Sequence, residues 1–555
     1  MTATNLLPKP VYVEEKGRNL YGKVLVKTTD DLNKVLTPEQ ITGFERHLSS
    51  EHFNREGYVI ASQQAGENAV IFVYSRTTAG FYYGQNTARK LAQNNDSRVR
   101  GLLIIDYPAF AIRGAIEGFY GIPWTWDERR DIIDAIAQAS FNTFVFAPPD
   151  INRKVNWREP LPDDYQGRLE RLINHAHKHH IRFVYEMLPI GIDLASDLDY
   201  RRLLNRCKEV VSLGADAIMV AFDDTNDYEG QHVKREKAGH GQALLLNNLL
   251  QQIGSDKVFL CLVPVEYYGV NVTPYLKTIG RELDLAVYVG WSGKKIRSPT
   301  VTEEDAFRFA EIVKRKPFLG HNFPVVDEMR KKRRLTIGPL QGLEAGLTRA
   351  LSGIAFNFME LPYTSLVSGY TAGDFSWNPD GYYSQRSLEN STAIHGKNLA
   401  KLSEINPESY VNPNGTSDIA LSLRERKLKD LSQDKILELR RIFDTMVTLD
   451  DLMSEGVDSR IYREIRPWLV QGNITGTLGN LILDGKMKDL NWKARSYGAL
   501  KMVSGYRLGG LVFEDWILRE MGFPAILFYH VPQLRLVADF FETVARKRHQ
   551  RQKIM

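Results

Sequence analysis

The stretch Ala217-Ile-Met-Val-Ala-Phe222, which runs directly into Asp223-Asp224, is wholly apolar and belongs to a series of eight such runs. The spacing of about 27 to 41 residues between the runs is that of a β-strand followed by a helix. Continuous apolar strands are typical of parallel sheets buried on both faces, and eight of them predict a closed (β/α)8 TIM barrel. The runs cover residues 112–116, 143–147, 182–187, 217–222, 258–263, 285–289, 317–320 and 353–356.

Amphipathic stretches separate most of these runs, as expected for the helices of a barrel. Thr125 and Glu128 form the T-x-x-E capping box that opens a helix, and helical spacing continues through residues 127–140. The alternative architecture is an open, doubly wound α/β sheet. We favour the barrel because no strand is followed by the G-x-G-x-x-G that marks many doubly wound sheets.

The chain of 555 residues is long enough for about two to four domains. Before the barrel, strand-like runs alternate with a stretch of helical spacing at residues 77–91, which indicates a small α/β domain. After residue 361 the strand signal fades and helical spacing dominates. We predict three domains: the small α/β domain at residues 1–108, the catalytic barrel at 109–385 and an α-helical bundle at 386–555.

Charge and cysteine content exclude several classes of protein. The 72 Lys and Arg exceed the 67 Asp and Glu by five, yet ten positive charges lie in residues 330–334 and in the last ten residues. A nucleic-acid surface spreads its basic residues over a face among aromatic residues, so we predict no nucleic-acid partner. Two cysteines, Cys207 and Cys261, cannot build a disulfide framework. With no apolar leader and no 18-residue apolar run, we expect a cytoplasmic protein that does not bind membranes.

The reacting groups of a (β/α)8 barrel lie on the loops that follow the C-terminal ends of the strands. Asp223 and Asp224 occupy this position after the fourth run. Two adjacent, partly desolvated carboxylates repel each other, and one ionised plus one protonated carboxyl is the pair that a glycosidase uses. Alternatively, one acid caps the following helix and the other is solvated; the residues alone favour neither interpretation. Other polar or aromatic residues that follow the runs are Glu117, Tyr267, Trp291, Asn322, Asp327 and Asn357, and Gly118 follows the first run.

A histidine cluster raises the possibility of a metal site. His175 and His179 are four residues apart, a spacing at which two imidazoles on one helix face chelate a cation. They precede the third predicted strand, however, and therefore belong to the face of the barrel that serves stability. Positive charge also suits a helix C-terminus. We predict neither a functional metal nor a cofactor.

The segment Arg113-Gly-Ala-Ile-Glu-Gly-Phe-Tyr-Gly-Ile-Pro-Trp124 closely resembles the opening strand of the glycoside hydrolase family 84 barrel. This family contains the protein O-GlcNAcases and bacterial enzymes once called hyaluronidases. The similarity extends over about residues 100 to 385, and residues 80–87 resemble the small α/β domain that precedes such barrels. Further matching segments are Phe222-Asp-Asp224, Pro264-Val-Glu-Tyr267, Trp291-Ser-Gly293, Asn322-Phe-Pro-Val-Val-Asp327 and Asn357-Phe-Met-Glu360.

The resemblance implies a β-N-acetylhexosaminidase of the O-GlcNAcase (β-N-acetylglucosaminidase) type, a glycoside hydrolase that removes a terminal β-linked 2-acetamido-2-deoxy sugar with retention of configuration. In substrate-assisted catalysis the substrate's own acetamido oxygen attacks the anomeric carbon to give an oxazoline. Asp223 would orient the acetamido N–H, and Asp224 would serve as general acid and then as base. The implied sugar-binding residues are Gly118, Tyr267, Asn322, Asp327 and Asn357. Read without the family, the asparagines satisfy strand-end backbone groups, Gly118 serves a turn and Tyr267 packs in the core.

Two departures from the family pattern bear on specificity. The second strand is followed by Ala147-Pro-Pro149-Asp150, whereas the family has a lysine at the position of Pro149; Lys154 is nearby in sequence. Gly320 stands where the family has a tryptophan that walls the pocket. These changes favour altered sugar specificity, so the glycoside partner is either a glycoprotein or a small-molecule or nucleoside glycoside. A non-catalytic sugar-binding or scaffold protein is the remaining alternative. The basic residues 330–334 closely follow Asp327, and we hypothesise that they favour an anionic aglycone.

Overall fold

The computed structural model describes residues 6–93, 98–148, 156–223, 235–253, 258–326, 335–406, 423, 428–486, 516–517 and 520. The chain forms two compact units, Met1–Val325 with Pro339–Ser391, and Val326–Gly338 with Thr392–Met555. The first unit contains an N-terminal α/β region and the barrel, and the second is helical in its described part. The domain boundaries at residues 108 and 385 stay a prediction.

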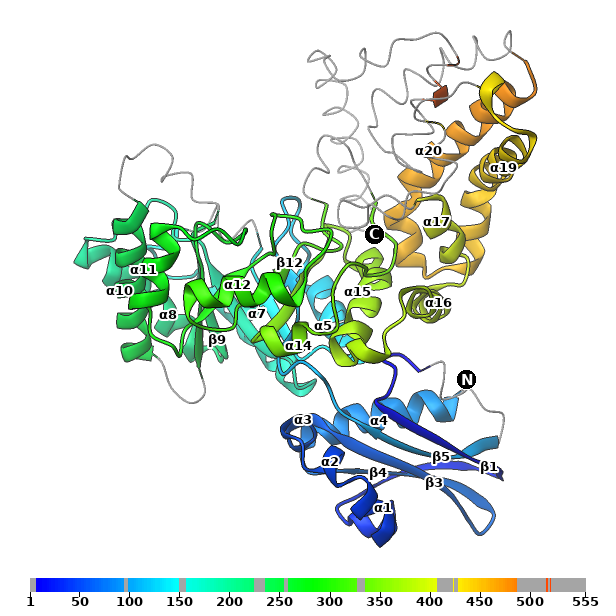
Figure 1. The fold of residues 1–555 in the computed structure, drawn as a ribbon, viewed down its shortest axis with the longest axis horizontal. Helices are drawn as coiled ribbons and strands as arrows, with labels where there is room; N and C mark the ends of the chain where they lie inside the picture. The colour runs from blue at the N-terminus through cyan, green and yellow to red at the C-terminus, as the bar shows by residue number, and fades with distance from the viewer. Residues whose placement is uncertain are drawn as a thin grey trace. The chain divides into compact units, whose positions relative to one another are not determined.

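The N-terminal region is a five-stranded sheet with helices on both faces (Figure 1). Tyr58 and Ile60 of the third strand pack with α4 (Thr78–Gln93), whereas Val59 and Ala61 pack on the opposite face with the shorter helices. This alternation is the period-two pattern of a strand covered on both sides. The strand order is β1 (Tyr12–Tyr21), β5 (Arg98–Asp106), β3 (Tyr58–Ala65), β4 (Asn68–Ser75), β2 (Val24–Thr29); the shorter helices are α1 (Pro38–Gly43), α2 (Glu45–Leu48) and α3 (Glu51–Glu56).

Eight parallel strands close into a barrel, which confirms the predicted (β/α)8 fold and excludes the open doubly wound sheet. Closure is made by the last strand on the first, with Ile354 level with Arg113 and Asn357 level with Ile116. Inward-facing apolar side chains fill the barrel. The strands are β6 (Arg113–Glu117), β7 (Thr143–Phe146), β8 (Arg182–Met187), β9 (Ala217–Ala221), β10 (Phe259–Val263), β11 (Tyr288–Trp291), β12 (Phe318–His321) and β13 (Gly353–Asn357).

One predicted strand was misplaced. The apolar run at residues 285–289 begins in a turn, where Asp284 accepts hydrogen bonds from the backbone N–H groups of Ala286 and Val287. Leu285 is 71% exposed, and the sixth strand begins only at Tyr288. The apolar composition of residues 285–289 was therefore not sufficient to predict burial.

Helices separate the barrel strands in sequence. The capping box predicted at Thr125 and Glu128 opens α5, with both reciprocal hydrogen bonds present. Continuous burial of the strands follows from this outer layer of helices on one side and the filled interior on the other. The helices are α5 (Trp126–Gln138), α7 (Asp163–Lys178), α8 (Asp197–Ser212), α10 (Arg235–Ile253), α11 (Pro274–Glu282), α12 (Glu303–Val313), α14 (Leu347–Ala350) and α15 (Pro362–Trp377).

The helical unit is built around two long helices that run side by side (Figure 1). Phe443 and Met446 of α19 are fully buried, as their helical spacing predicts. Gly476 and Gly479 of α20 permit the close approach. A Cβ at Gly476 would lie within 3.0 Å of Phe443 and Met446, and a Cβ at Gly479 would lie within 3.0 Å of Phe443. Helical structure beyond residue 486, also expected from the sequence, falls mostly outside the described residues. The helices after the barrel are α16 (Ser384–His395), α17 (Leu399–Ile405), α19 (Gln433–Gly456) and α20 (Ser459–Leu483).

Among the described residues, every helix is either too short or too polar to cross a membrane.

Candidate active site

Three polar groups meet where the first, seventh and eighth barrel strands end. Asn357 closes β13, Gly118 follows β6 and Asn322 follows β12. The Oδ1 atom of Asn357 accepts a hydrogen bond from the Gly118 N–H at 3.2 Å, and Asn357 Nδ2 donates to Asn322 Oδ1 at 3.1 Å. Asn322 Nδ2 donates in turn to the Ile296 carbonyl at 2.7 Å. The structure thus brings together three of the predicted site residues and orients both amides.

The glycine at position 118 is explained by this close approach. A Cβ on Gly118 would lie 3.0 Å from Ile116 Cγ2 and 3.4 Å from Asn357 Oδ1. A side chain would therefore crowd Ile116 and come into contact with the amide that Gly118 binds. The bond from Gly118 to Asn357 also satisfies a strand-end backbone group, so the structural interpretation of these residues is compatible with a role in binding.

Tyr267 lies at the same end of the barrel, after β10. Its carbonyl accepts a hydrogen bond from the Ser292 N–H at 2.8 Å, and Trp291 Nε1 donates to the Gly269 carbonyl at 2.9 Å. These bonds tie the segment after β10 to the end of β11. Tyr267 itself is partly exposed.

Asp223 lies just past the end of β9. The preceding Phe222 N–H extends the strand ladder by donating to the Val263 carbonyl at 2.9 Å. The residue is partly buried, which fits a carboxylate at the mouth of an apolar barrel. Asp224 and Asp327, the other two predicted acids, lie outside the described residues. Also outside the described residues are Pro149, Lys154 and the basic residues 330–334.

Glu186 is a candidate that the sequence analysis missed. It lies on β8 level with Met219 of β9, which is level with Cys261 of β10, and both of these face the barrel interior. Level residues of neighbouring strands point to the same face, so the Glu186 carboxyl also points inward. Burial, reinforced by the negative charge of Asp223, raises the pKa of Glu186 to about 8. The available signal was a lone acid at an inward position of an apolar strand.

We expect Glu186→Gln to stabilise the protein at pH 8 and to have a much smaller effect at pH 5. Between the ordinary pKa of 4.5 and the folded value of about 8, the folded carboxyl holds a proton that the unfolded chain has released, so stability falls as pH rises. Glutamine removes this loss, a gain of about 2 to 4 kcal/mol at pH 8. Urea unfolding at both pH values measures it, with the exposed Glu170→Gln as control. Equal gains at pH 5 and pH 8 would contradict the assignment.

The barrel has unfilled room beside Asn322. Gly320 of β12 is level with Ala355, which faces the interior, and among the described residues a Cβ on Gly320 would meet only Ile116 Cδ1, at 4.0 Å. Asn322 follows two residues later and, while the chain stays extended, points to the same side. The absence of a side chain at position 320 therefore leaves space next to the asparagine pair.

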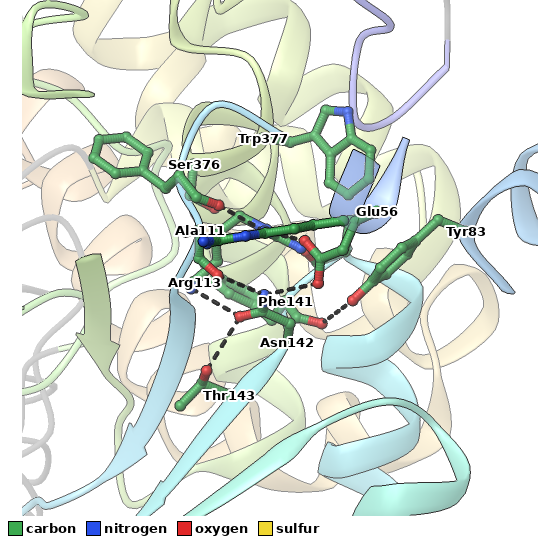
Figure 2. Close-up of polar contacts among 12 residues, drawn as sticks. Glu56, Tyr83, Ala111, Arg113, Phe141, Asn142, Thr143, Ser376 and Trp377 are labelled. Atoms are coloured by element: carbon green, nitrogen blue, oxygen red, sulfur yellow. Dashed lines mark hydrogen bonds and ion pairs between the residues drawn. The ribbon is translucent and has the colours of Figure 1, made fainter. Parts of the chain in front are cut away.

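A buried polar network holds the first barrel strand (Figure 2). Arg113, at the start of β6, is fully buried, and its Nη1 atom lies 2.8 Å from Glu56 Oε2 of the N-terminal region. Asn142 Nδ2 donates to Glu56 Oε1 at 2.9 Å, and Asn142 Oδ1 accepts from the Arg113 N–H at 2.9 Å. The guanidinium also lies over the Trp377 ring, 5.0 Å from its centroid. The N-terminal region thereby fixes the strand that leads to Gly118.

Glu117, at the other end of this strand, has a structural role. Its carboxylate binds Arg129 through two hydrogen bonds of 2.8 and 2.9 Å, and both side chains are almost fully buried. Glu117 Oε1 also accepts the Trp124 N–H at 3.1 Å. The pair fixes both ends of the loop that contains Gly118, and it accounts for an acid that the sequence placed at the rim.

Metal-binding and thiol groups are scarce at this end of the barrel. In the described ranges, the side chains here bring together no three histidine, cysteine, aspartate or glutamate ligands. Both cysteines are buried, and burial raises the pKa of the Cys207 thiol to about 12. The described part of the site therefore offers carboxyl, amide and phenol groups, which suit recognition of a hydroxylated ligand.

Comparisons with known proteins relate the barrel, and the residues that directly follow it, to one family. The family model described as NAGidase, beta-N-acetylglucosaminidase, matches residues 113–405. The chain is 28% identical over 287 residues to the protein O-GlcNAcase of Mus musculus, covering 49% of this chain and 31% of that protein. It is 29% identical over 255 residues to the protein O-GlcNAcase of Rattus norvegicus, covering 44% and 27%. The matched region thus spans less than a third of either curated relative.

Solved structures show the same fold. The structure of CpGH84B superposes with a TM-score of 0.77 at 22% identity, over 93% of this chain and 99% of that chain. A mutant of the Thermobaculum terrenum O-GlcNAc hydrolase superposes with a TM-score of 0.66 at 23% identity, over 74% and 95%. Because the family model covers more than half of the chain, including every barrel strand, this protein belongs to the β-N-acetylglucosaminidase family, glycoside hydrolase family 84.

Proposed function

We propose that this protein is a retaining β-N-acetylglucosaminidase that hydrolyses a terminal β-linked 2-acetamido-2-deoxy sugar by substrate-assisted catalysis. The observation that carries the proposal is the family match over residues 113–405. Asp223, Asn322 and Asn357 lie within this range, at the C-terminal ends of strands of the closed barrel, and this position supports the proposal. A site on strand ends of a rigid barrel is the usual location of catalysis in this fold.

The proposed reaction has two steps. In the first, the acetamido oxygen attacks the anomeric carbon, the bond to the leaving oxygen breaks, and Asp224 gives that oxygen its proton. Asp223 accepts a hydrogen bond from the acetamido N–H and stabilises the positive charge that develops on the oxazoline ring. In the second step Asp224 removes a proton from water, which attacks the anomeric carbon from the side the leaving group vacated. The bond between this carbon and the acetamido oxygen breaks, which opens the oxazoline and regenerates the acetamido group. Two displacements retain the configuration.

The asparagine pair is well suited to hold the sugar in position for this reaction. Asn357 and Asn322 bond to each other and to backbone groups, so their remaining donor and acceptor positions point in set directions before substrate binds. We assign Asn322 and Tyr267 to the acetamido group, and Asp327 and Asn357 to sugar hydroxyls. Gly118 would contribute a backbone contact.

The assay that tests the proposal uses p-nitrophenyl β-N-acetylglucosaminide and the corresponding N-acetylgalactosaminide. We expect wild-type protein to hydrolyse the glucosaminide, and Asn357→Ala to lower kcat/KM by about 10- to 100-fold, because a buried partner of the sugar and of Gly118 is lost. Asn33→Ala, an exposed asparagine of the N-terminal region, serves as control and leaves the rate unchanged. If folded wild-type protein hydrolyses neither compound over hours, the proposal is wrong for simple glycosides.

A second candidate function is a specialised enzyme with altered sugar specificity. The open space at Gly320, on the same side as Asn322, favours it. If the acetamido group lies beside Asn322, this space admits a longer N-acyl chain. N-propionyl and N-butyryl glucosaminides would then be hydrolysed at rates similar to the N-acetyl compound, and Gly320→Trp would restore preference for N-acetyl. Rejection of the longer chains by wild type would leave the first candidate alone.

A further inference from the structure

Three metal-ligating side chains converge far from the proposed active site, on the outer helices of the barrel. Asp134 belongs to α5, His175 lies in the last turn of α7, and His179 caps that helix just before β8 begins. Their ligand atoms all lie within 4.8 Å of one another. Contrary to the expectation from the sequence that no functional metal is bound, we propose that Asp134, His175 and His179 bind a divalent transition-metal ion of the zinc type. This inference is independent of the proposed glycosidase activity.

The arrangement of the ligand atoms supports the proposal. Asp134 Oδ1 lies 2.6 Å from His175 Nε2 and 2.9 Å from His179 Nε2, so both imidazoles aim the same nitrogen at one carboxylate oxygen. Bonds of about 2.0 to 2.1 Å to a tetrahedral ion would place these atoms roughly 3.3 Å apart. The carboxylate oxygen therefore needs to move away from each imidazole nitrogen by less than about 1 Å. The two imidazole nitrogens lie within 4.8 Å of each other, and rotation about side-chain bonds adjusts their separation as well.

Exposure leaves room for a further ligand. The side chains of His175, His179 and Asp134 are 25%, 28% and 43% exposed. Two histidines and one carboxylate with an open fourth position make a coordination set that zinc occupies with water. Imidazole nitrogen also favours zinc, copper, nickel or cobalt over magnesium and calcium, which prefer oxygen.

A neighbouring tyrosine orients one of the ligands. The Tyr82 hydroxyl of α4 lies 3.0 Å from His179 Nδ1. With Nε2 bound to a metal, Nδ1 carries the ring proton and donates it to the Tyr82 oxygen, an outer contact of the kind that fixes most metal-binding histidines. The Tyr82 ring also packs against His180, with centroids 5.4 Å apart. A bound ion would thus link α5, α7 and, through Tyr82, the N-terminal region.

This location fits a stabilising role and opposes a catalytic one. The site lies at the N-terminal ends of the barrel strands, opposite the asparagine pair. The spacing of His175 and His179 was visible in the sequence, but Asp134 is 41 residues away from His175 and only the packing of α5 on α7 brings it in. Lys178 precedes His179 in the chain, and its positive charge disfavours binding of a cation at this site.

The test is titration of the full, untagged and chelator-treated protein with zinc, followed by calorimetry and by the thermal unfolding midpoint. We expect one equivalent to bind saturably and to raise the midpoint, because an ion that binds only the folded state stabilises it. His179→Gln and Asp134→Asn should each weaken binding at least tenfold and abolish the rise. His177→Gln is the matched control: His177 lies on the same helix end but pairs with Asp216, and its loss should leave zinc binding unchanged.

Cobalt gives a second readout that does not depend on stability. Substitution at this site should produce the visible absorption of a four-coordinate ion in wild type and in His177→Gln, and lose it in His179→Gln. Absence of saturable zinc binding by folded wild type would overturn the proposal. So would equal losses in His177→Gln and His179→Gln, which would indicate unspecific chelation by surface histidines. Magnesium should bind in none of the variants.

Discussion

Asp224→Asn is expected to lower kcat/KM about 10²- to 10⁴-fold on a β-N-acetylglucosaminide with an alkyl leaving group. Under the proposed function, Asp224 protonates the departing oxygen, and asparagine has no acidic proton to give. An alkoxide is a poor leaving group, so loss of the acid lowers kcat/KM on the alkyl glycoside by the full amount. A p-nitrophenolate leaves without help, so the same variant should lose much less in the first step with the aryl glycoside.

The ratio of the kcat/KM losses on the alkyl and the aryl glycoside distinguishes loss of the general acid from damage to the fold. Asp223→Asn should slow both substrates to a similar extent, because stabilisation of the oxazoline charge does not depend on the leaving group. Initial rates on methyl and p-nitrophenyl β-N-acetylglucosaminide, measured for wild type and both variants, give the ratio directly. If Asp224→Asn slows both substrates equally, then Asp224 is not the general acid.

Glu56→Gln is expected to destabilise the protein by about 3 to 5 kcal/mol. Arg113 is fully buried, and Glu56 is its anionic partner (Figure 2). Removing that charge leaves a buried guanidinium without compensation. Burial disfavours the charged form of Glu56, but the charge of Arg113 and hydrogen bonds from Arg113 and Asn142 outweigh burial and hold the pKa of Glu56 below its usual value.

Urea unfolding of wild type and Glu56→Gln measures the loss. Because the pKa of Glu56 is lowered, its contribution is present above the unfolded pKa of about 4.5 and disappears as pH falls through the folded value, so the two proteins should converge in acid. Glu51→Gln on the same helix is the control: Glu51 is 72% exposed and pairs with Arg55, and its loss should cost less than about 1 kcal/mol. Equal effects of the two substitutions would show that the buried pair contributes no more than a surface pair.

Much of the fold could be predicted because its signals are local. Strands of a parallel barrel are covered on both faces, so each of them needs a continuous apolar run, and seven of the eight runs mark their strand to within two residues at either end. The helix start at Thr125 depends on a side chain three residues away, which is also within reach of sequence reasoning. The sixth strand was misplaced because Leu285 is apolar yet exposed.

The site was less predictable because its properties arise between strands. In the sequence little distinguishes Glu186 from other acidic residues. Its pKa is raised by burial in the barrel and by the charge of Asp223, which is 37 positions later in the sequence. The contact of Gly118 with Asn357 spans 239 residues and exists only because the last strand closes on the first. Asp134 likewise lies beside the two histidines only because two helices that are distant in sequence pack on each other.

The sequence by itself determined that this chain is a (β/α)8 barrel with an N-terminal α/β region, and it placed an acid and two asparagines at strand ends. Periodicity and strand-end position are properties of neighbouring residues, so they can be recognised from the amino-acid sequence alone. Only the tertiary structure decided which of these groups touch, which acid keeps its proton and where open space remains, because contact, burial and charge coupling are set by residues that are distant in the chain.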